Sequence, residues 1–263
     1  MEELRTVNPL VVGSSPTLGA MSKLNGLPKI KYINIDSHTN KKEFIELKFE
    51  QFNISNYERF NAITSPQVKR RYLNPKEVGC ILSHLNIIYD FYKNSTDEMM
   101  IIVEDDIDIS PIANWEFSWM EFVNSLPDFE IVQLMRNQEP ENQQYSKLKE
   151  WEWRDKSTAA YLITQDYARK MSRISKDYEY VINYLPNLSD QADWPWNHKV
   201  GPVADYALYK NFKTLSTCIF QQTHSLDGQW SSTSPNDEPD WYKTQHNQIL
   251  EYWSKPHGLD DII

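Results

Sequence analysis

The sequence predicts an α/β fold in which helices flank a mostly parallel central sheet. Three observations support this fold class. Short apolar segments at 30–35, 99–103 and 130–135 have the length of buried strands. The segment 74–93 carries apolar residues at helical spacing. The order strand, helix, strand over 30–63 is the usual opening of a parallel sheet covered by helices.

The opening unit has a helix between two strands. Residues 37–53, SHTNKKEFIELKFEQFN, begin with polar residues suited to a helix start. Residues 57–63, YERFNAI, have the composition of the second strand. The apolar residues expected roughly on one face of the helix are Phe44, Leu47 and Phe52. We therefore expect this face to pack against the sheet.

The helix predicted at 74–93 has a well-defined start. Asn74 is a suitable N-cap, Pro75 suits the first helical position, and Glu77 stands three residues after the cap. Its apolar stripe consists of Val78, Ile81, Leu82, Leu85, Ile88 and Tyr92. The next segment, 99–103, is continuously apolar, which favours a central parallel strand over an edge strand.

The later elements follow the same alternation. Segments 130–135, 157–164 and 214–220 are predicted strands. Segments 165–174 and 202–212 are predicted helices, the second with a proline at its start. The two kinds of element alternate, as in an α/β domain.

We expect residues 1–28 to form an N-terminal extension and residues 29–263 to form a single domain. The first 28 residues lack hydrophobic periodicity, and no later segment has the composition of a linker. Residues 177–200 are rich in Trp, Pro and Asn and suggest a surface excursion. The tail from 225 is polar, with further Trp and Pro.

Composition excludes several functional classes. Apolar residues make up 40% and charged residues 24% of the chain, as in a folded globular protein. A net charge of −10 argues against nucleic acid as a partner and disfavours anionic membrane surfaces. Seven glycines against 14 prolines argue against a glycine-rich phosphate loop. The two cysteines, Cys80 and Cys218, form neither a disulfide framework nor a zinc-ligand motif and are interpreted as buried thiols.

The sequence also bears on compartment. Its start lacks the basic and apolar regions of a signal peptide. No stretch approaches the roughly 18 apolar residues of a membrane-spanning helix. We therefore expect a cytoplasmic, reducing location and no integral membrane segment.

Four carboxylates follow the predicted buried strand, at Glu104, Asp105, Asp106 and Asp108. If the strand continues, side-chain alternation places Asp105 on one side and the other three on the opposite side. Two such charges about 4 Å apart repel by about 1 kcal/mol in water and about 4 kcal/mol at an effective dielectric of 20. A divalent cation bound by carboxylate oxygens, Mg²⁺ or Mn²⁺, would relieve this repulsion and neutralise a diphosphate. A solvated acidic turn is the alternative interpretation.

Other candidate residues each have a structural alternative. His84 is a packing residue or a ligand, and His224 follows a predicted strand and could reach the same sheet edge. Asp205 is a buried base or a first-turn acid that favours the helix dipole. Asp190 and Asp193, in the Trp-rich segment, could contact a sugar hydroxyl.

Taken in order, these segments resemble glycosyltransferase family 25, the lipooligosaccharide and procollagen galactosyltransferase group. The resemblance covers about residues 30–225. It rests on INIDSHTNKKEF…NISNYERFNAI, LNPKEVGCILSHLNII, MMIIVEDDIDI, STAAYLITQDYARKM and PVADYALY. The combination of E-x-G-C-x-x-S-H with an apolar strand ending in EDD, about twenty residues apart, is its most specific part. DSHTNKK stands where the family has an arginine-rich turn, with lysines at 41 and 42.

The resemblance implies a GT-A-like fold, a UDP-sugar donor and Mn²⁺ or Mg²⁺ as cofactor. It implies that Asp106 touches the metal, with Glu104 near the ribose or in a second shell and Asp105 completing the acidic motif. It further implies that His224 supplies a third metal contact. Asp205 is the first candidate for the base and Asp193 the second.

The resemblance also implies a donor pocket. The uridine side of the donor would lie against the segment after the first strand, where the candidate residues are Asn34, Asp36, Lys41 and Lys42. Glu77 and His84 either bracket this pocket or only fix the helix that carries them.

Three functions are compatible with these features. The first is a metal-dependent hexosyltransferase that moves galactose or glucose from a UDP-sugar to a glycan or protein hydroxyl, with inversion. The second is a catalytically inactive carbohydrate-binding or scaffold protein of the same fold, an interpretation that the altered turn at 37–42 favours. The third, a metal-dependent phosphoesterase, would require additional His or Asp ligands.

Overall fold

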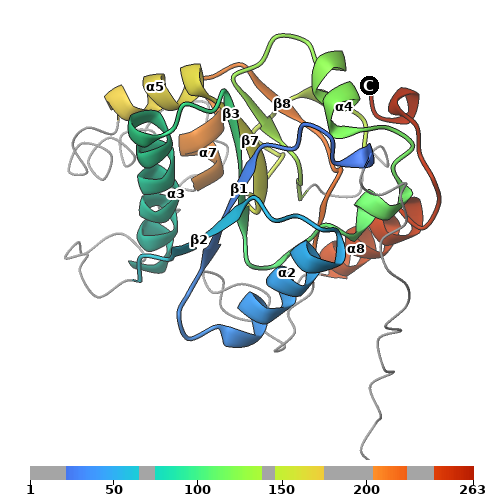
Figure 1. Ribbon diagram of the computed structural model, residues 1–263, viewed down its shortest axis with the longest axis horizontal. Helices are drawn as coiled ribbons and strands as arrows, with labels where there is room; N and C mark the ends of the chain where they lie inside the picture. The colour runs from blue at the N-terminus through green and yellow to red at the C-terminus, as the bar shows by residue number, and fades with distance from the viewer. Residues whose placement is uncertain (1–21, 65–74, 138–145, 175–203, 224–239) are drawn as a thin grey trace, which may run out of the picture.

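The computed structural model describes residues 22–64, 75–137, 146–174, 204–223 and 240–263, which form a mixed α/β fold (Figure 1). The strands are β1 Lys29–Asn34, β2 Tyr57–Asn61, β3 Met99–Glu104, β4 Ile107–Asp108, β5 Ile131–Gln133, β6 Lys149–Glu150, β7 Ala160–Thr164, β8 Thr214–Ser216 and β9 Gln221–Gln222. The α-helices are α2 Thr39–Gln51, α3 Pro75–Asn94, α4 Trp119–Ser125, α5 Gln165–Ile174, α7 Ala204–Tyr209 and α8 Asp240–Tyr252. Two 3₁₀ helices are η2 Ser110–Asn114 and η3 Leu259–Asp261.

The central sheet has seven strands in the order β2-β1-β3-β7-β5-β8-β6. β1 is parallel to β2 and β3, and β5 is parallel to β8. β7 is antiparallel to both β3 and β5, and β6 is antiparallel to β8. Strands β2, β1, β3, β5 and β8 therefore share one direction, which confirms the predicted mostly parallel sheet. The strand predicted at 157–164 is the antiparallel strand β7.

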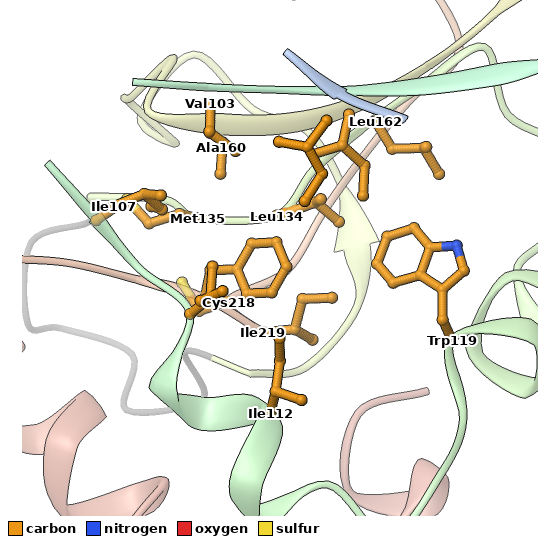
Figure 2. Packing of buried hydrophobic residues seen from close by; sticks show 14 of the residues in the cluster. Val103, Ile107, Ile112, Trp119, Leu134, Met135, Ala160, Leu162, Cys218 and Ile219 are labelled. Carbon is orange, nitrogen blue, oxygen red and sulfur yellow. The ribbon is translucent and has the colours of Figure 1, made fainter. Parts of the chain in front are cut away.

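The two faces of the sheet carry separate apolar clusters. Met100 and Ile102 of β3 belong to the cluster that also holds Ile81 and Leu85 of α3. Helices α3, α5 and α7 lie together on this side (Figure 1). The alternate β3 residues, Ile101 and Val103, belong to the second cluster, which lies toward α2, η2, α4 and α8 and is partly shown in Figure 2. The alternation of a strand thus sends successive β3 side chains to different cores.

Helix α2 packs through a different face from the one predicted. Its buried residues are Lys41, Ile45 and Phe49, four positions apart, whereas Leu47 is 56% exposed. A spacing of four residues returns to the same side of a helix, so these three side chains form one stripe. Phe52 is buried just after the helix end. The prediction missed this stripe because it includes a lysine.

The C-terminal part contains structure that the sequence analysis did not predict. Helix α8 lies in the tail interpreted as polar, and Ile249 and Trp253 at its end are buried in the second cluster. The Trp253 indole Nε1 donates a hydrogen bond to the Cys218 carbonyl oxygen at 3.0 Å. None of the helices in the described part of the chain has the length and apolar character to cross a membrane. Residues 177–200 and Asn74 lie outside the described residues.

Candidate active site

The carboxyl ends of β1, β2 and β3 meet at one edge of the sheet. The three strands are parallel, and the register pairs Ile33 with Glu104 and Asn34 with Asn61. Asp36 lies two residues after the end of β1, and Asp105 and Asp106 follow β3. Ligands of open α/β sheets bind at such an edge. The structure therefore brings the predicted donor segment and the acidic motif to one place.

Asp105 points to the α2 side of this edge. The Asn34 Nδ2 donates a hydrogen bond to its Oδ2 at 2.7 Å, and the Lys41 Nζ lies 3.9 Å from its Oδ1. Burial raises the pKa of Asp105, and Lys41 and Asn34 oppose this rise. Lys41, predicted to hold the donor, is buried and serves here as a counter-charge to the acidic motif.

Asp106 has a carboxylate oxygen without a hydrogen-bond partner among the described residues. Its Oδ2 accepts a hydrogen bond from the Gln222 Nε2 at 2.8 Å, while its main-chain oxygen accepts one from the Thr223 amide at 2.7 Å. Its Oδ1 is buried and has no hydrogen-bond partner among the described residues. Burial, followed by the charges of Glu104 and Asp105, raises the pKa of Asp106 to about 7. A buried carboxylate with a free oxygen is a ready ligand for a cation.

Glu104 faces α3, on the opposite side from Asp105. Its Oε1 accepts a hydrogen bond from the Thr158 Oγ1 at 2.7 Å and lies 3.4 Å from the His84 Nε2. Burial alone would raise the pKa of Glu104, but His84, Thr158 and Lys41 together lower it. His84 is fully buried, and its Nδ1 is hydrogen-bonded to the Tyr161 hydroxyl at 2.8 Å.

Asp108 does not share the side of Glu104, as a continuous strand would require. A turn at 105–106 ends β3, and β4 then pairs with β9. The Asp108 carboxylate accepts hydrogen bonds from the Ser110 amide at 2.9 Å and from the Gln221 Nε2 at 2.8 Å, and the Lys48 Nζ lies 3.5 Å away. Although burial alone would raise the pKa of Asp108, Lys48 and these hydrogen bonds lower it. Asp108 is thus a structural carboxylate.

Asp36 is held by β2. The Arg59 Nη2 donates a hydrogen bond to its Oδ1 at 2.6 Å, and the Asn61 Nδ2 donates to its Oδ2 at 2.8 Å. Arg59 also donates from Nε to the Asn34 Oδ1 at 3.0 Å. These hydrogen bonds fix the orientation of the Asp36 carboxylate, which is exposed at the edge. Lys42, the other predicted residue of this segment, is half-buried.

Asp205 lies in the first turn of α7, as predicted. The Ser157 amide donates a hydrogen bond to its Oδ2 at 2.8 Å. Burial raises the pKa of Asp205, with a smaller contribution from the charge of Glu104. Among the described residues, the Asp205 side chain thus contacts Ser157, and the charge of Glu104 acts on it through space.

Some predicted residues cannot be placed. His224, Asp190 and Asp193 lie outside the described residues, and so does the side chain of Glu77 on α3. The sequence analysis missed Gln222 and Thr158, which orient Asp106 and Glu104. Gln222 belongs to the short strand β9, and Thr158 lies two residues before β7. Both have polar neighbours in the sequence, and nothing in the local sequence distinguishes them.

No protein-family model matches the sequence, and no curated protein matches it. Among solved structures, the chain is similar to a glycosyltransferase involved in the glycosylation of the major capsid of PBCV-1. The TM-score is 0.38 and the identity 13%, over 70% of this chain and 76% of that chain. A197 from STIV has a TM-score of 0.36 at 9% identity, over 81% of this chain and 96% of that chain. The glycosyltransferase GlyE of Streptococcus pneumoniae TIGR4 has a TM-score of 0.34 at 11% identity, over 89% of this chain and 58% of that chain.

Proposed function

We propose that the protein is a metal-dependent glycosyltransferase that uses a UDP-sugar donor. The observation that carries this proposal is the Asp106 carboxylate, which is buried at the sheet edge with one oxygen lacking a hydrogen-bond partner in the described part of the chain. Glu104 and Asp105 flank it and add negative charge. The sequence resemblance to glycosyltransferase family 25 includes the same three residues.

The acidic edge fits a hard divalent cation. Its donor atoms are carboxylate oxygens, which suit Mn²⁺ or Mg²⁺. Lys41 supplies positive charge on the Asp105 side, but Asp106 keeps a raised pKa despite it. Asp106 would hold the ion, with Glu104 beside it, and His224 remains a proposed third ligand. When bound, the ion would neutralise charge on the departing diphosphate.

The donor nucleotide would bind along the segment that follows β1. The Asp36 carboxylate is exposed and fixed by Arg59 and Asn61, so it can accept hydrogen bonds from a ribose or a uracil. Asn34 links this segment to the acidic motif through its hydrogen bond to Asp105. Because Lys41 is directed at Asp105, we propose the half-buried Lys42 for the phosphate contact.

Asp205 is our candidate for the base that deprotonates the acceptor hydroxyl, in a transfer with inversion. A general base works best with a pKa near the working pH, and burial moves the pKa of Asp205 in that direction. The hydrogen bond from the Ser157 amide to Oδ2 fixes the orientation of the carboxylate that would take the proton of the acceptor hydroxyl. We propose galactose or glucose as the sugar and a glycan or protein hydroxyl as the acceptor. Asp193 is the second candidate for the base.

A thermal-shift panel tests the donor and the metal together. UDP-, GDP- and CMP-sugars are each added with Mn²⁺ and with a chelator, and hydrolysis or transfer is then measured for the sugar that stabilises the protein. We expect stabilisation by a UDP-sugar only with Mn²⁺. Asp106→Ala should abolish both this stabilisation and turnover while the circular dichroism spectrum is retained. Near-normal activity in that variant would overturn the site, and glycan binding without metal-dependent turnover would support a scaffold protein instead.

A further inference from the structure

Three ligand atoms of mixed chemistry meet on the α3 side of the sheet edge. The Cys80 sulfur, a ring nitrogen of His84 and a carboxylate oxygen of Glu104 all lie within 4.8 Å of one another. Cys80 and His84 are four residues apart on α3, so they project from the same face of the helix toward the end of β3. We propose that Cys80, His84 and Glu104 form a Zn²⁺ site beside the acidic edge. This site does not depend on the proposed transferase activity.

His84 has the surroundings of a metal ligand. Its side chain is fully buried, and the Tyr161 hydroxyl is hydrogen-bonded to its Nδ1 at 2.8 Å. Its Nε2 faces the Glu104 Oε1 at 3.4 Å, an ion-pair distance that is longer than a well-formed hydrogen bond, and it has no other partner within the described residues. Buried polar atoms are normally satisfied, so this nitrogen calls for an explanation. Histidines that bind metals usually have one ring nitrogen held by a neighbour and the other directed at the ion.

Charge around the thiol favours a cation at the same point. The carboxylates of Glu104, Asp205 and Asp106 all act on the Cys80 thiol through space, and the Thr158 side chain interacts with the same thiol by a hydrogen bond. The negative potential that disfavours a thiolate attracts a divalent ion, and the ion takes the place of the thiol proton. The Cys80 side chain is half-buried.

The ligand set selects Zn²⁺ over the ions proposed for Asp106. A thiolate and an imidazole suit zinc, whereas Mg²⁺ and Mn²⁺ prefer oxygen ligands alone. Around a tetrahedral zinc ion, sulfur at about 2.3 Å and nitrogen or oxygen at about 2.0–2.2 Å lie roughly 3.3–3.7 Å from each other. The present spread, within 4.8 Å, requires a contraction of at most about 1.5 Å between any two of these atoms. Three protein ligands leave a fourth position for water or another group.

Cobalt substitution tests the site without any nucleotide sugar. The full chain, cleared of metals, is titrated with Co²⁺, and the near-ultraviolet charge-transfer band of a cobalt–thiolate bond is recorded. The chain has two cysteines, so such a band has two possible sources. We expect one Co²⁺ per chain with this band, and loss of the band when Zn²⁺ is added. Absence of the band in the wild-type protein would overturn the proposal.

Two cysteine variants identify the source of the band. Cys80→Ser should abolish it. Cys218→Ser is the matched control and should retain it, because Cys218 belongs to the core cluster on the other face of the sheet (Figure 2) and its sulfur contacts the backbone of Arg136. A band that survives Cys80→Ser, or that disappears in a folded Cys218→Ser, contradicts the assignment.

A third variant tests the site through its supporting contact. Tyr161→Phe keeps the ring but removes the hydroxyl that holds the His84 Nδ1. We expect Co²⁺ binding to weaken by roughly 10- to 100-fold while the charge-transfer band at saturation is unchanged. Unchanged affinity in this variant would contradict the role given to the Tyr161 hydroxyl in holding a metal-bound His84. Zinc binding without glycosyl transfer would support the zinc site and contradict the proposed activity, and transfer without zinc binding would do the reverse.

Discussion

Replacement of Asp106 by asparagine should stabilise the protein in the absence of metal. Asp106 is 8% exposed, and its pKa is raised from 3.8 to about 7 by burial and by Glu104 and Asp105. A shift of about three units corresponds to about 4 kcal/mol of unfavourable interaction in the ionised state. The asparagine oxygen can keep the hydrogen bond from Gln222, and its amide can face the neighbouring carboxylates. After relaxation we expect a net gain of about 1–3 kcal/mol, or about 3–9 °C in Tm.

The sign of this effect fixes its pH dependence. The pKa of Asp106 is higher in the folded protein than in the unfolded chain. The wild type is therefore penalised most above pH 7, and the penalty shrinks as pH falls and disappears below the unfolded value of 3.8. The advantage of Asp106→Asn should fall to less than about half between pH 8 and pH 5.

Asp108→Asn is the matched control, two residues along the chain. Its carboxylate accepts hydrogen bonds from Ser110 and Gln221 and lies beside Lys48, and its pKa is lowered. An asparagine can satisfy only part of this set, so we expect a loss of about 1–3 kcal/mol. The same substitution should therefore have opposite signs at the two positions.

Calorimetry with a chelator at pH 8 and pH 5 measures both effects, and a repeat with Mn²⁺ tests the site. Mn²⁺ should raise the Tm of the wild type and of Asp108→Asn relative to their chelated forms, but not that of Asp106→Asn. The reasoning fails if both variants lose stability in chelator. It also fails if Asp106→Asn is stabilised by Mn²⁺ as strongly as the wild type.

Three further substitutions have defined outcomes. Lys41→Met removes the counter-charge of Asp105 and should lower the free energy of unfolding, measured in urea, by roughly 2–4 kcal/mol. Mn²⁺ should then stabilise this variant more than it stabilises the wild type. An unchanged urea midpoint would contradict the counter-charge role. The asparagine of Asp205→Asn can still accept the Ser157 hydrogen bond, so UDP binding should persist while turnover falls roughly 10²- to 10⁴-fold. Loss of UDP binding would instead show that Asp205 binds the nucleotide sugar or the metal. Ser118→Ala removes the capping box of α4 with Glu121 and should lower unfolding free energy by about 1 kcal/mol without affecting Mn²⁺ binding, and a change in metal affinity would show unexpected coupling.

The sequence by itself determined the main elements and the position of the acidic edge. Short apolar runs located β1 and β3, because a strand buried on both faces leaves a continuous apolar segment, and helical spacing of apolar residues located α3. The abrupt change from apolar β3 to three carboxylates marked the end of a buried strand. Periodicity was less informative where a buried stripe includes a charge, as in α2 with Lys41, or where a polar tail contains a helix, as in α8.

Only the tertiary structure decided which side chains face each other. The turn at 105–106 sends Glu104 toward His84 and Asp105 toward Lys41, and it leaves Asp108 to a structural role. The set of Cys80, His84 and Glu104 has no zinc-motif spacing, because its members come from a helix and from a strand. Local sequence records how each segment is buried, whereas contacts between segments depend on how the whole chain packs.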